Sequence, residues 1–219
     1  TSSAKGISIF DVDVLNGRLV FRNEIQVSNA MYQTVSADGR FLYSITDNSV
    51  AAFAVMGDGD LKRLNTASIR GIRGCHLQAS PDGKFLFVSG NYDGKITVLR
   101  TAPDGSVGQI TDSVFHKSPG SVAERVFRPQ VRCCRLTPDG KYLCAADAGL
   151  DQIVLYRLDS RTGKLERAYT YRCQPKTGPC YMLFSKDGRF LYVIKEQNNT
   201  ITVFSYDGSG PSPVLEKVQ

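Results

Sequence analysis

A unit of one turn and one strand occurs four times in this chain of 219 residues. The copies read SADGRFLYSIT from Ser36, SPDGKFLFVSG from Ser80, TPDGKYLCAAD from Thr137 and SKDGRFLYVIK from Ser185. Their Asp-Gly steps begin at Asp38, Asp82, Asp139 and Asp187, so the successive spacings are 44, 57 and 48 residues. These periods are typical of propeller blades. The repeat therefore predicts a series of similar β-sheets, one for each copy.

Each copy has the composition of a turn that leads into a strand. Its glycine tolerates the positive φ that such turns need, and the alternating aromatic and aliphatic residues after it indicate a strand packed on two faces. A second β-rich run follows each copy: SVAAFAV from Ser49, KITVLR from Lys95, QIVLYRLD from Gln152 and TITVFSYD from Thr200. A weaker strand follows a Gly-centred turn, as in TGKLERAYTY from Thr162. Four strands per unit make a propeller blade.

The first segment, GISIFDVDVLNGRLVFRNEIQ from Gly6, matches only the second half of a unit. We therefore predict an all-β fold: a β-propeller of four-stranded blades, with about four and a half blades in a single domain over residues 1–219. A propeller protects its strand edges by closing into a ring. We accordingly expect this sequence to be part of a longer protein, with further blades on the C-terminal side.

The composition argues against several classes of function, among them nucleic-acid binding, membrane spanning and zinc binding. With 42% apolar residues the chain can bury a core, and its 27 basic residues are scattered, so the net charge of +6 does not predict nucleic-acid binding. It fits a solvated basic surface, or a local site for an anionic small molecule. No apolar run is long enough to span a membrane, and we expect a cytoplasmic protein. The six cysteines lack zinc-ligand spacing and are expected as buried free thiols. No metal or organic cofactor is expected.

Three segments carry a resemblance to a known family: GCHLQASPDGKFLFVSGNYDGKITVLR, RLTPDGKYLCAADAGLDQIVLYRLDSRTGKLE and GPCYMLFSKDGRFLYVIKEQNNTITVF. The chain resembles, along essentially its whole length, the seven-bladed propeller lactonases. These are the bacterial cycloisomerase-type 6-phosphogluconolactonases and the related fungal carboxy-muconate lactonizing enzymes. The resemblance implies seven blades, of which about two and a half lie outside this sequence, and a reaction that opens sugar lactones.

The functional motifs of that family are altered here. Members usually have Pro-His-x-His before the third full blade; Glu124, Arg125 and Pro129 fit the pattern, but Gln130 and Arg132 stand in place of the histidines. The next blade usually opens Gly-Pro-Arg-His and here has Cys180 and Tyr181 at the last two places. The acidic residue after the following strand is retained as Glu196.

Lactone hydrolysis needs a base that activates water and a cation or donors that hold the developing oxyanion. Gln130 cannot be a base near neutral pH. Arg132 can replace the cation absent at Cys180 if both positions face one channel, because arginine binds carboxylate or phosphate through a planar fork of donors. Our first hypothesis is a sugar lactone hydrolase with Glu196, Arg132 and His76 as catalytic residues. The alternative is a non-catalytic propeller that binds a ligand or serves as a scaffold, because the fold permits either.

Other residues are candidates for substrate binding. Asn91 and Tyr92 follow a strand of the second blade, and we place Asp147 and Glu196 at the equivalent position of later blades, although such residues are also ordinary turn formers. His76 either faces the channel or is a hydrogen-bonded histidine that packs between blades. The loop between Ser113 and Pro129 is either a binding loop or a mobile surface loop, and its His116 is expected to be solvated. The predicted contacts to an anionic sugar lactone are Asn91, Tyr92, Glu124, Arg125, Arg128, Gln130, Asp147 and Tyr181. The oligomeric state stays open.

Overall fold

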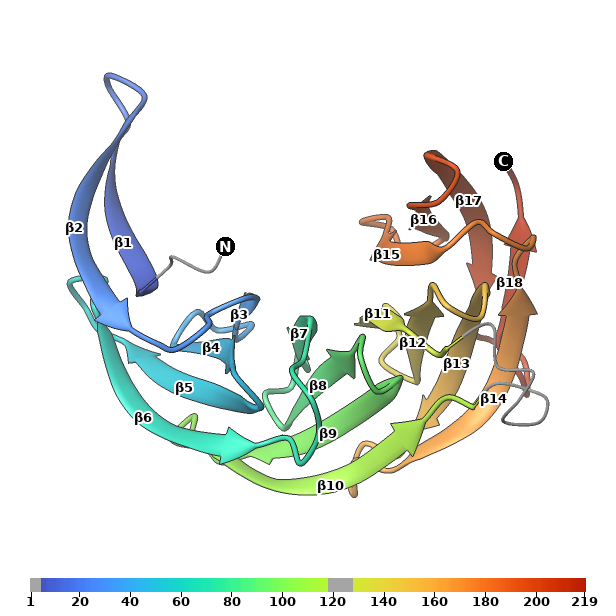
Figure 1. The fold of residues 1–219 in the computed structure, drawn as a ribbon, viewed down its shortest axis with the longest axis horizontal. Helices are drawn as coiled ribbons and strands as arrows, with labels where there is room; N and C mark the ends of the chain where they lie inside the picture. The colour runs from blue at the N-terminus through green and yellow to red at the C-terminus, as the bar shows by residue number, and fades with distance from the viewer. Residues whose placement is uncertain (1–4, 118–127) are drawn as a thin grey trace.

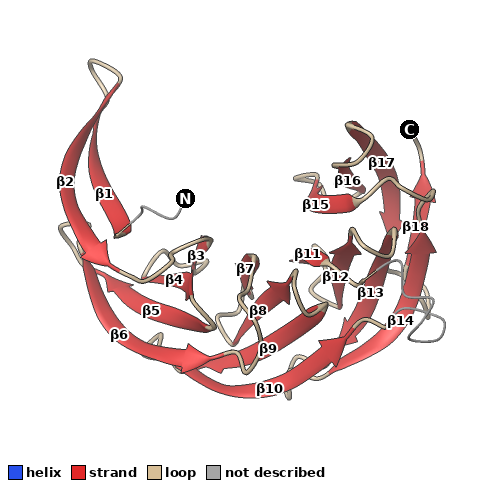
Figure 2. Ribbon diagram, in the orientation of Figure 1, coloured by secondary structure: helices blue, strands red, loops and turns tan. Residues whose placement is uncertain are grey.

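The computed structural model describes residues 5–117 and 128–219, and within those ranges all regular secondary structure is β-strand (Figures 1 and 2). The strands form one two-stranded sheet and four four-stranded antiparallel sheets. These sheets lie side by side in an arc around a common axis, with the two-stranded sheet at one end and the C-terminal sheet at the other (Figure 1). The predicted all-β propeller fold is confirmed, and about four and a half blades are present. The assignment of residues 1–219 to a single domain stays a prediction.

Each blade follows chain order from the axis outward, except that the half-blade has outer strands alone. The half-blade contains β1 (Gly6–Asp13) and β2 (Arg18–Gln26). The first blade contains β3 (Gln33–Val35), β4 (Phe41–Thr46), β5 (Ser49–Val55) and β6 (Leu61–Ser68). The second contains β7 (His76–Ala79), β8 (Phe85–Gly90), β9 (Lys95–Thr101) and β10 (Val107–Phe115).

The third and fourth blades repeat this plan. The third contains β11 (Val131–Leu136), β12 (Tyr142–Asp147), β13 (Gln152–Leu158) and β14 (Leu165–Arg172). The fourth contains β15 (Pro179–Phe184), β16 (Phe190–Lys195), β17 (Thr200–Asp207) and β18 (Val214–Lys217). The strands β3, β7, β11 and β15 therefore lie nearest the axis (Figure 1).

The repeated Asp-Gly unit forms the turn between the two innermost strands of each blade. In the second blade the Ser80 hydroxyl donates to Asp82 over 2.6 Å and accepts the backbone N–H of Phe85 over 2.9 Å. Gly83 has a φ of 68°, which a residue with a side chain rarely adopts. The same bonds from a Ser or Thr hydroxyl recur in the other three blades. The repeat seen in the sequence is thus a repeated set of turn hydrogen bonds.

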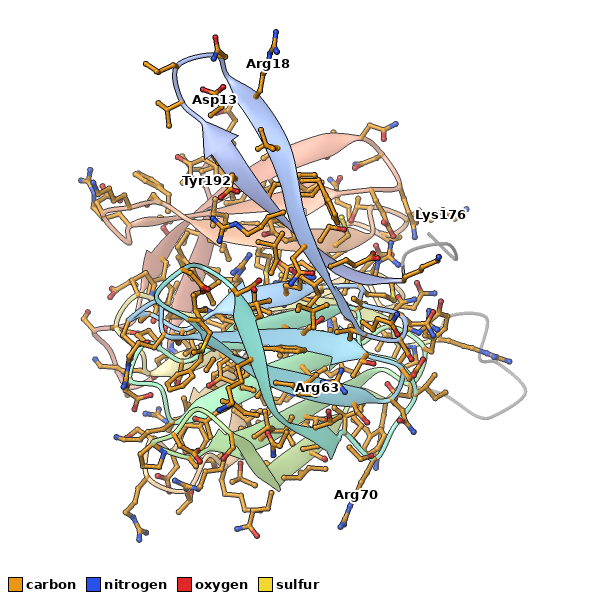
Figure 3. The ribbon with its side chains drawn as sticks, turned by 90° about the vertical axis from the view of Figure 1, so that its left-hand side faces the viewer. Asp13, Arg18, Arg63, Arg70, Lys176 and Tyr192 are labelled. Atoms are coloured by element: carbon orange, nitrogen blue, oxygen red, sulfur yellow. The ribbon has the colours of Figure 1, made fainter. Side chains whose placement is uncertain are left out.

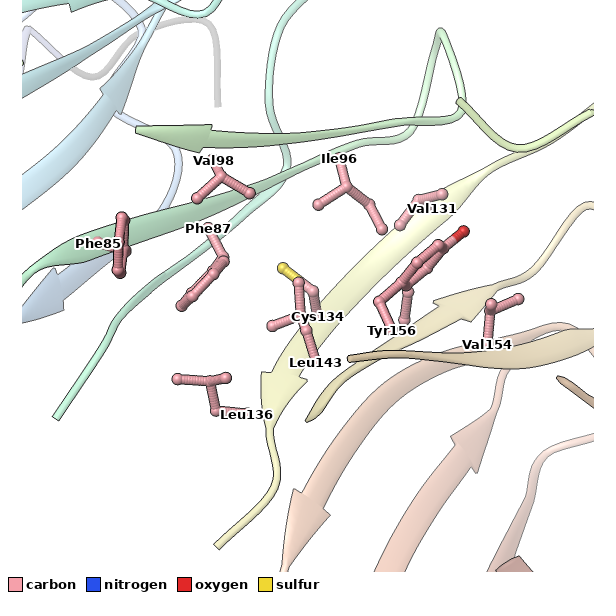
Figure 4. Packing of buried hydrophobic residues seen from close by; sticks show 11 residues of the cluster. Phe85, Phe87, Ile96, Val98, Val131, Cys134, Leu136, Leu143, Val154 and Tyr156 are labelled. Carbon is pink, nitrogen blue, oxygen red and sulfur yellow. The ribbon is translucent and has the colours of Figure 1, made fainter. Parts of the chain in front are cut away.

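The hydrophobic core lies between neighbouring blades. Figure 4 shows the interface between the second and third blades, where Phe85 and Phe87 of β8 pack with Leu143, Val154 and other buried residues of the third blade. Equivalent clusters join the third blade to the fourth, the first to the second, and the half-blade to the first. The sheets of the first three blades therefore pack apolar side chains on both faces, which explains why β8 is buried along its whole length. The half-blade and the fourth blade each leave apolar residues exposed on one face, such as Phe21 and Ile201.

Two features of the strands bring polar residues to one end of the axis. The strands β8 and β16 end at Gly90 and Lys195, so the residues that follow them leave the sheet at equivalent places. Antiparallel pairing puts these ends beside the starts of the innermost strands, as in Pro179 opposite Lys195. The register of β11 shifts between Val131 and Cys133, and that of β15 shifts between Pro179 and Tyr181. A bulge of this kind redirects a side chain.

Candidate functional site

Arg132 connects three blades at this end of the axis. It occupies the shifted position of β11 in the third blade. Its Nη1 donates to Oδ1 of Asn91, from the second blade, over 3.3 Å. Its Nη2 donates to Oε2 of Glu196, from the fourth blade, over 2.5 Å. The structure thus brings together three of the residues that the sequence singled out.

The Arg132–Glu196 pair is open to a ligand. The two side chains are 34% and 36% exposed, so neither is buried beneath the blades. The backbone holds Glu196 in place, because its N–H donates to the carbonyl of Gly178 over 2.9 Å. A carboxylate next to a guanidinium offers a base and a cation within one small site, which are the groups that hydrolysis of an ester bond requires.

Cys180 lies beside this pair. It occupies the shifted position of β15, equivalent to that of Arg132 in β11, and its thiol donates to the carbonyl of Ile194 over 3.5 Å. Burial raises the pKa of Cys180, and the charge of Glu196 raises it further. The thiol therefore stays protonated near neutral pH, which makes it a poor nucleophile.

All six cysteines are free, and four of them are buried, as the sequence predicted; Cys75 and Cys180 are half-buried. Burial raises the pKa of Cys133 to about 11, and it raises the pKa of the neighbouring Cys134 further. These adjacent thiols are thus neutral packing residues, as expected for cysteine in an apolar core.

His76 belongs to a separate layer of aromatic rings. It is 2% exposed, its ring centroid lies 4.6 Å from that of Tyr32 and 6.0 Å from that of Tyr181, and both ring nitrogens lack a hydrogen-bond partner in the described ranges. Burial and the nearby charge of Arg135 lower the pKa of His76 to about 3. A histidine with this pKa is neutral at physiological pH and a weak base. His76 packs among these rings without the hydrogen bonds expected of a histidine that wedges blades together. Its low pKa leaves it out of our proposed catalytic residues.

Tyr181 contacts an arginine that the sequence analysis did not single out. Arg135 of β11 donates through Nη2 to the Tyr181 hydroxyl and through Nε to the carbonyl of Met182 over 3.2 Å. The Tyr181 hydroxyl lies 3.4 Å from that of Tyr32, so side chains of the first and fourth blades meet across the axis. The sequence feature that could have identified Arg135 is its position as the second arginine in the otherwise apolar strand VRCCRL.

Asp147 does not line the site with Asn91 and Glu196, so its predicted place is wrong. Asp147 is the last residue of β12, whereas Asn91 and Glu196 are the first residues after β8 and β16. Since successive side chains of a strand point to opposite faces, a difference of one residue redirects the side chain. Ala148 is the true equivalent of Asn91 in the third blade.

Asp147 instead forms a buried pair with His116. The two side chains are fully buried, and Nδ1 of His116 lies 2.6 Å from Oδ2 of Asp147. Oδ1 of Asp147 accepts the backbone N–H groups of Gln130, Gly149 and Leu150 over 2.8 to 3.0 Å. The expectation that His116 is a solvated loop residue is therefore wrong, because this carboxylate holds it inside the protein and also fixes the chain just before β11.

Three of the remaining candidates are among the described residues, and none of them has a described bond to Arg132 or Glu196. Gln130 is half-buried and is held through its backbone by Asp147. Tyr92 is 66% exposed, and Arg128 is exposed. Glu124 and Arg125 fall outside the described residues. The roles predicted for these side chains in substrate binding stay predictions.

Within residues 5–117 and 128–219, no helix is long and apolar enough to cross a lipid bilayer. The same ranges hold no cluster of three or more His, Cys, Asp or Glu side chains that could bind a metal ion.

Comparison with known families agrees with this arrangement. The model of the family described as "Lactonase, 7-bladed beta-propeller" matches residues 1–219. The chain therefore belongs to the seven-bladed β-propeller lactonase family. Its curated relatives include the 6-phosphogluconolactonase of Bacillus subtilis, which is 26% identical over 210 residues; the match covers 93% of this chain and 59% of the relative.

Two solved structures are similar throughout the chain. The periplasmic gluconolactonase of Pseudomonas aeruginosa matches with a TM-score of 0.89 at 25% identity, covering 99% of this chain and 64% of its own. A Bacteroides fragilis protein, provisionally described as a 6-phosphogluconolactonase, matches with a TM-score of 0.86 at 31% identity, covering 99% of this chain and 63% of its own. The chain thus spans about three fifths of the length of these relatives.

Proposed function

We propose that the protein hydrolyses sugar lactones at the site formed by Arg132 and Glu196. The observation that carries this proposal is the 2.5 Å contact between these two side chains, accessible at one end of the propeller axis. Membership of the lactonase family and the printed activities of the Bacillus and Pseudomonas relatives support it.

The two side chains divide the reaction between them. Glu196 accepts a proton from a water molecule as the water oxygen bonds to the lactone carbonyl carbon. Arg132 then donates hydrogen bonds to the negative charge that develops on the carbonyl oxygen. When the bond between this carbon and the ring oxygen breaks, the proton passes from Glu196 to the ring oxygen. The product is an open hydroxy acid, and the enzyme returns to its initial state.

Asn91 orients the cation in this mechanism. Its side-chain oxygen accepts from Nη1 of Arg132, while Glu196 accepts from Nη2, so two blades hold the guanidinium plane from both sides. A donor that is fixed in advance stabilises developing charge better than one that must reorganise during the reaction.

The direct test is lactone hydrolysis by the full-length natural protein, measured against the spontaneous rate for phosphorylated and free sugar lactones. The proposal expects acceleration by the wild type and its loss in Glu196→Gln. Glu216→Gln is the matched control, because Glu216 is an exposed carboxylate on β18. A wild-type rate equal to the spontaneous rate on every lactone refutes the proposal.

A second candidate function is ligand binding without catalysis. It is favoured by the ion pair itself, because N–H groups of Arg132 that already bond to Glu196 and Asn91 are not free to hold a developing oxyanion. Thermal protection by a sugar acid in a protein that does not accelerate hydrolysis would select this alternative. The cytoplasmic location remains our proposal, and fractionation of cells that express the natural gene tests it.

A further inference from the structure

The two arginines of β11 differ in how their charge is balanced. Arg132 pairs with the carboxylate of Glu196. Arg135 is half-buried, and its partners among the described residues are the uncharged hydroxyl of Tyr181 and the carbonyl of Met182. Its guanidinium carbon also lies 5.2 Å from the centroid of the Tyr181 ring. Within residues 5–117 and 128–219, no carboxylate pairs with Arg135.

The other groups around Arg135 are also neutral near pH 7. Burial raises the pKa of Tyr32 to about 12, and burial raises the pKa of Cys133 to about 11. His76 is uncharged, because its pKa is lowered to about 3 by burial and by Arg135 itself. A partly buried charge without a counter-charge is costly to fold. The described part of the chain therefore contains a cation on the innermost strand β11 with no counter-charge among the described residues, and a bound anion would lower this cost.

Arg135 has donors left for such an anion. A guanidinium carries five N–H groups, and the bonds to Tyr181 and Met182 occupy two of them. The free N–H groups of the two terminal nitrogens can form the fork that binds a carboxylate or phosphate through two bonds. Its contacts with the Tyr181 ring and hydroxyl hold this fork in one orientation, which lowers the entropic cost of binding.

The spacing of the two arginines suits one small substrate. Arg135 follows Arg132 by three residues on the same strand, so the two Cα atoms are separated by at most about 10 Å. The layer formed by Tyr32, His76 and Tyr181 adjoins Arg135, and its two hydroxyls meet 3.4 Å apart. Both arginines therefore lie on the innermost strand within a distance comparable with the length of a six-carbon sugar acid.

We propose that Arg135 binds a phosphate or carboxylate group at the end of the substrate remote from the lactone carbonyl. This inference rests on the proposed lactonase function for the identity of the reacting end, but the anion site itself does not depend on catalysis. Arg135 would thereby determine the preference for anionic over uncharged sugar lactones, while Arg132 and Glu196 act on the carbonyl.

The test uses the full-length natural protein and three lactones that share a six-carbon chain: one uncharged, one phosphorylated at carbon 6 and one with a carboxylate at carbon 6. Wild type is compared with Arg135→Gln and Arg135→Lys. Arg70→Gln is the matched control, because the Arg70 side chain is exposed at the rim (Figure 3). The proposal expects kcat/KM for the preferred anionic lactone, relative to the uncharged one, to fall by about 10- to 100-fold in Arg135→Gln, mainly through KM. The control keeps the wild-type ratio.

The two anionic lactones distinguish phosphate from carboxylate as the preferred group. An unchanged ratio for both in Arg135→Gln overturns the proposal. If that variant does not fold, Arg135→Lys decides, because lysine keeps the charge but lacks the fork. In Arg135→Lys we expect the ratio of kcat/KM for the preferred anionic lactone to kcat/KM for the uncharged lactone to fall about tenfold. An unchanged ratio in this variant overturns the proposal.

Calorimetric titration with the phosphorylated and carboxylated open-chain sugar acids separates this proposal from the proposed function. If the wild type does not hydrolyse lactones but binds one of these acids, and Arg135→Gln binds it at least tenfold more weakly, the lactonase function fails and the anion site stands. Equal binding by wild type and Arg135→Gln overturns the anion site, including the case in which a carboxylate from the rest of the protein already neutralises Arg135.

Discussion

The guanidinium of Arg132 and the carboxylate of Glu196 meet across the boundary between the third and fourth blades, with 2.5 Å between Nη2 and Oε2. Each residue lies at an irregular point of its blade: Arg132 at a register shift in β11 and Glu196 immediately after β16. The packing between blades therefore sets the geometry of the site. Variants that change buried contacts within and between blades are therefore best measured in the full-length protein.

Asp147→Asn is expected to destabilise the protein by about 3 kcal/mol, in the range for breaking one partner of a buried pair. Asparagine can still accept backbone N–H groups through its oxygen, but its amide presents a donor where His116 Nδ1 needs an acceptor. Urea unfolding measures the effect. Asp58→Asn, a change at an exposed turn residue, should stay within about 0.5 kcal/mol of wild type. Equal midpoints for the two variants would show that the buried pair adds little.

His76→Phe is expected to reduce the loss of stability in mild acid. The pKa of His76 is about 3 in the folded protein against 6.5 ordinarily, because burial and Arg135 disfavour the charged ring. Below pH 6.5 His76 is therefore protonated in the unfolded chain but stays unprotonated in the folded protein until the pH approaches 3. The contribution of His76 to the free energy of unfolding is intact above pH 6.5 and is lost as the pH falls toward 3. The loss between pH 7.5 and pH 5 is about 2 kcal/mol.

The measurement for His76 is the free energy of unfolding at pH 7.5, 6.5, 5.5 and 5.0 for wild type and His76→Phe. Working above pH 5 limits interference from ordinary carboxylates, and His116 is common to both proteins, so the difference between the curves isolates His76. Parallel curves would mean that His76 is solvated or charged in the folded protein, contrary to its burial among Tyr32, Tyr181 and Arg135.

Gly105→Ala is expected to destabilise the protein more than Gly83→Ala. Both glycines have positive φ, 83° and 68°, so either change costs about 1 kcal/mol in backbone strain. A Cβ on Gly83 meets only open space, whereas one on Gly105 overlaps the ring of Phe41 in the neighbouring blade. Displacing that ring adds about 1 to 3 kcal/mol. Urea unfolding of the two variants compares them, and equal losses would contradict the close packing at this blade contact.

Much of the fold could be predicted because it depends on residues that are close together in the sequence. The Asp-Gly turns, the alternating strands after them and the period between copies each depend on neighbouring residues. The convergence of Arg132 with Glu196 also followed, because the start of the innermost strand and the end of the next strand lie at the same end of every blade, beside one axis. These inferences needed the repeat and the approximate ends of strands, but no knowledge of individual side-chain contacts.

The wrong predictions concern Asp147, where a shift of one residue changes the direction of the side chain, and His116, where the contact is distant in the sequence. Asp147 and Glu196 both come at the end of a strand, but one is the last strand residue and the other follows it, and sequence alone places such boundaries only approximately. The burial of His116 depends on a carboxylate 31 residues away. The layer around Arg135 depends on side chains of four blades that meet at the axis, which no local pattern reveals.

A double-mutant cycle measures whether Arg132 and Glu196 act together on a lactone. The measurement is kcat/KM for a sugar lactone with wild type, Arg132→Gln, Glu196→Gln and the double variant. We predict that each single change lowers the rate constant by about 100-fold or more, and that the double variant is little worse than the poorer single one. Wild-type rates in Glu196→Gln, or losses that simply multiply in the double variant, would mean that the two side chains do not act together in catalysis.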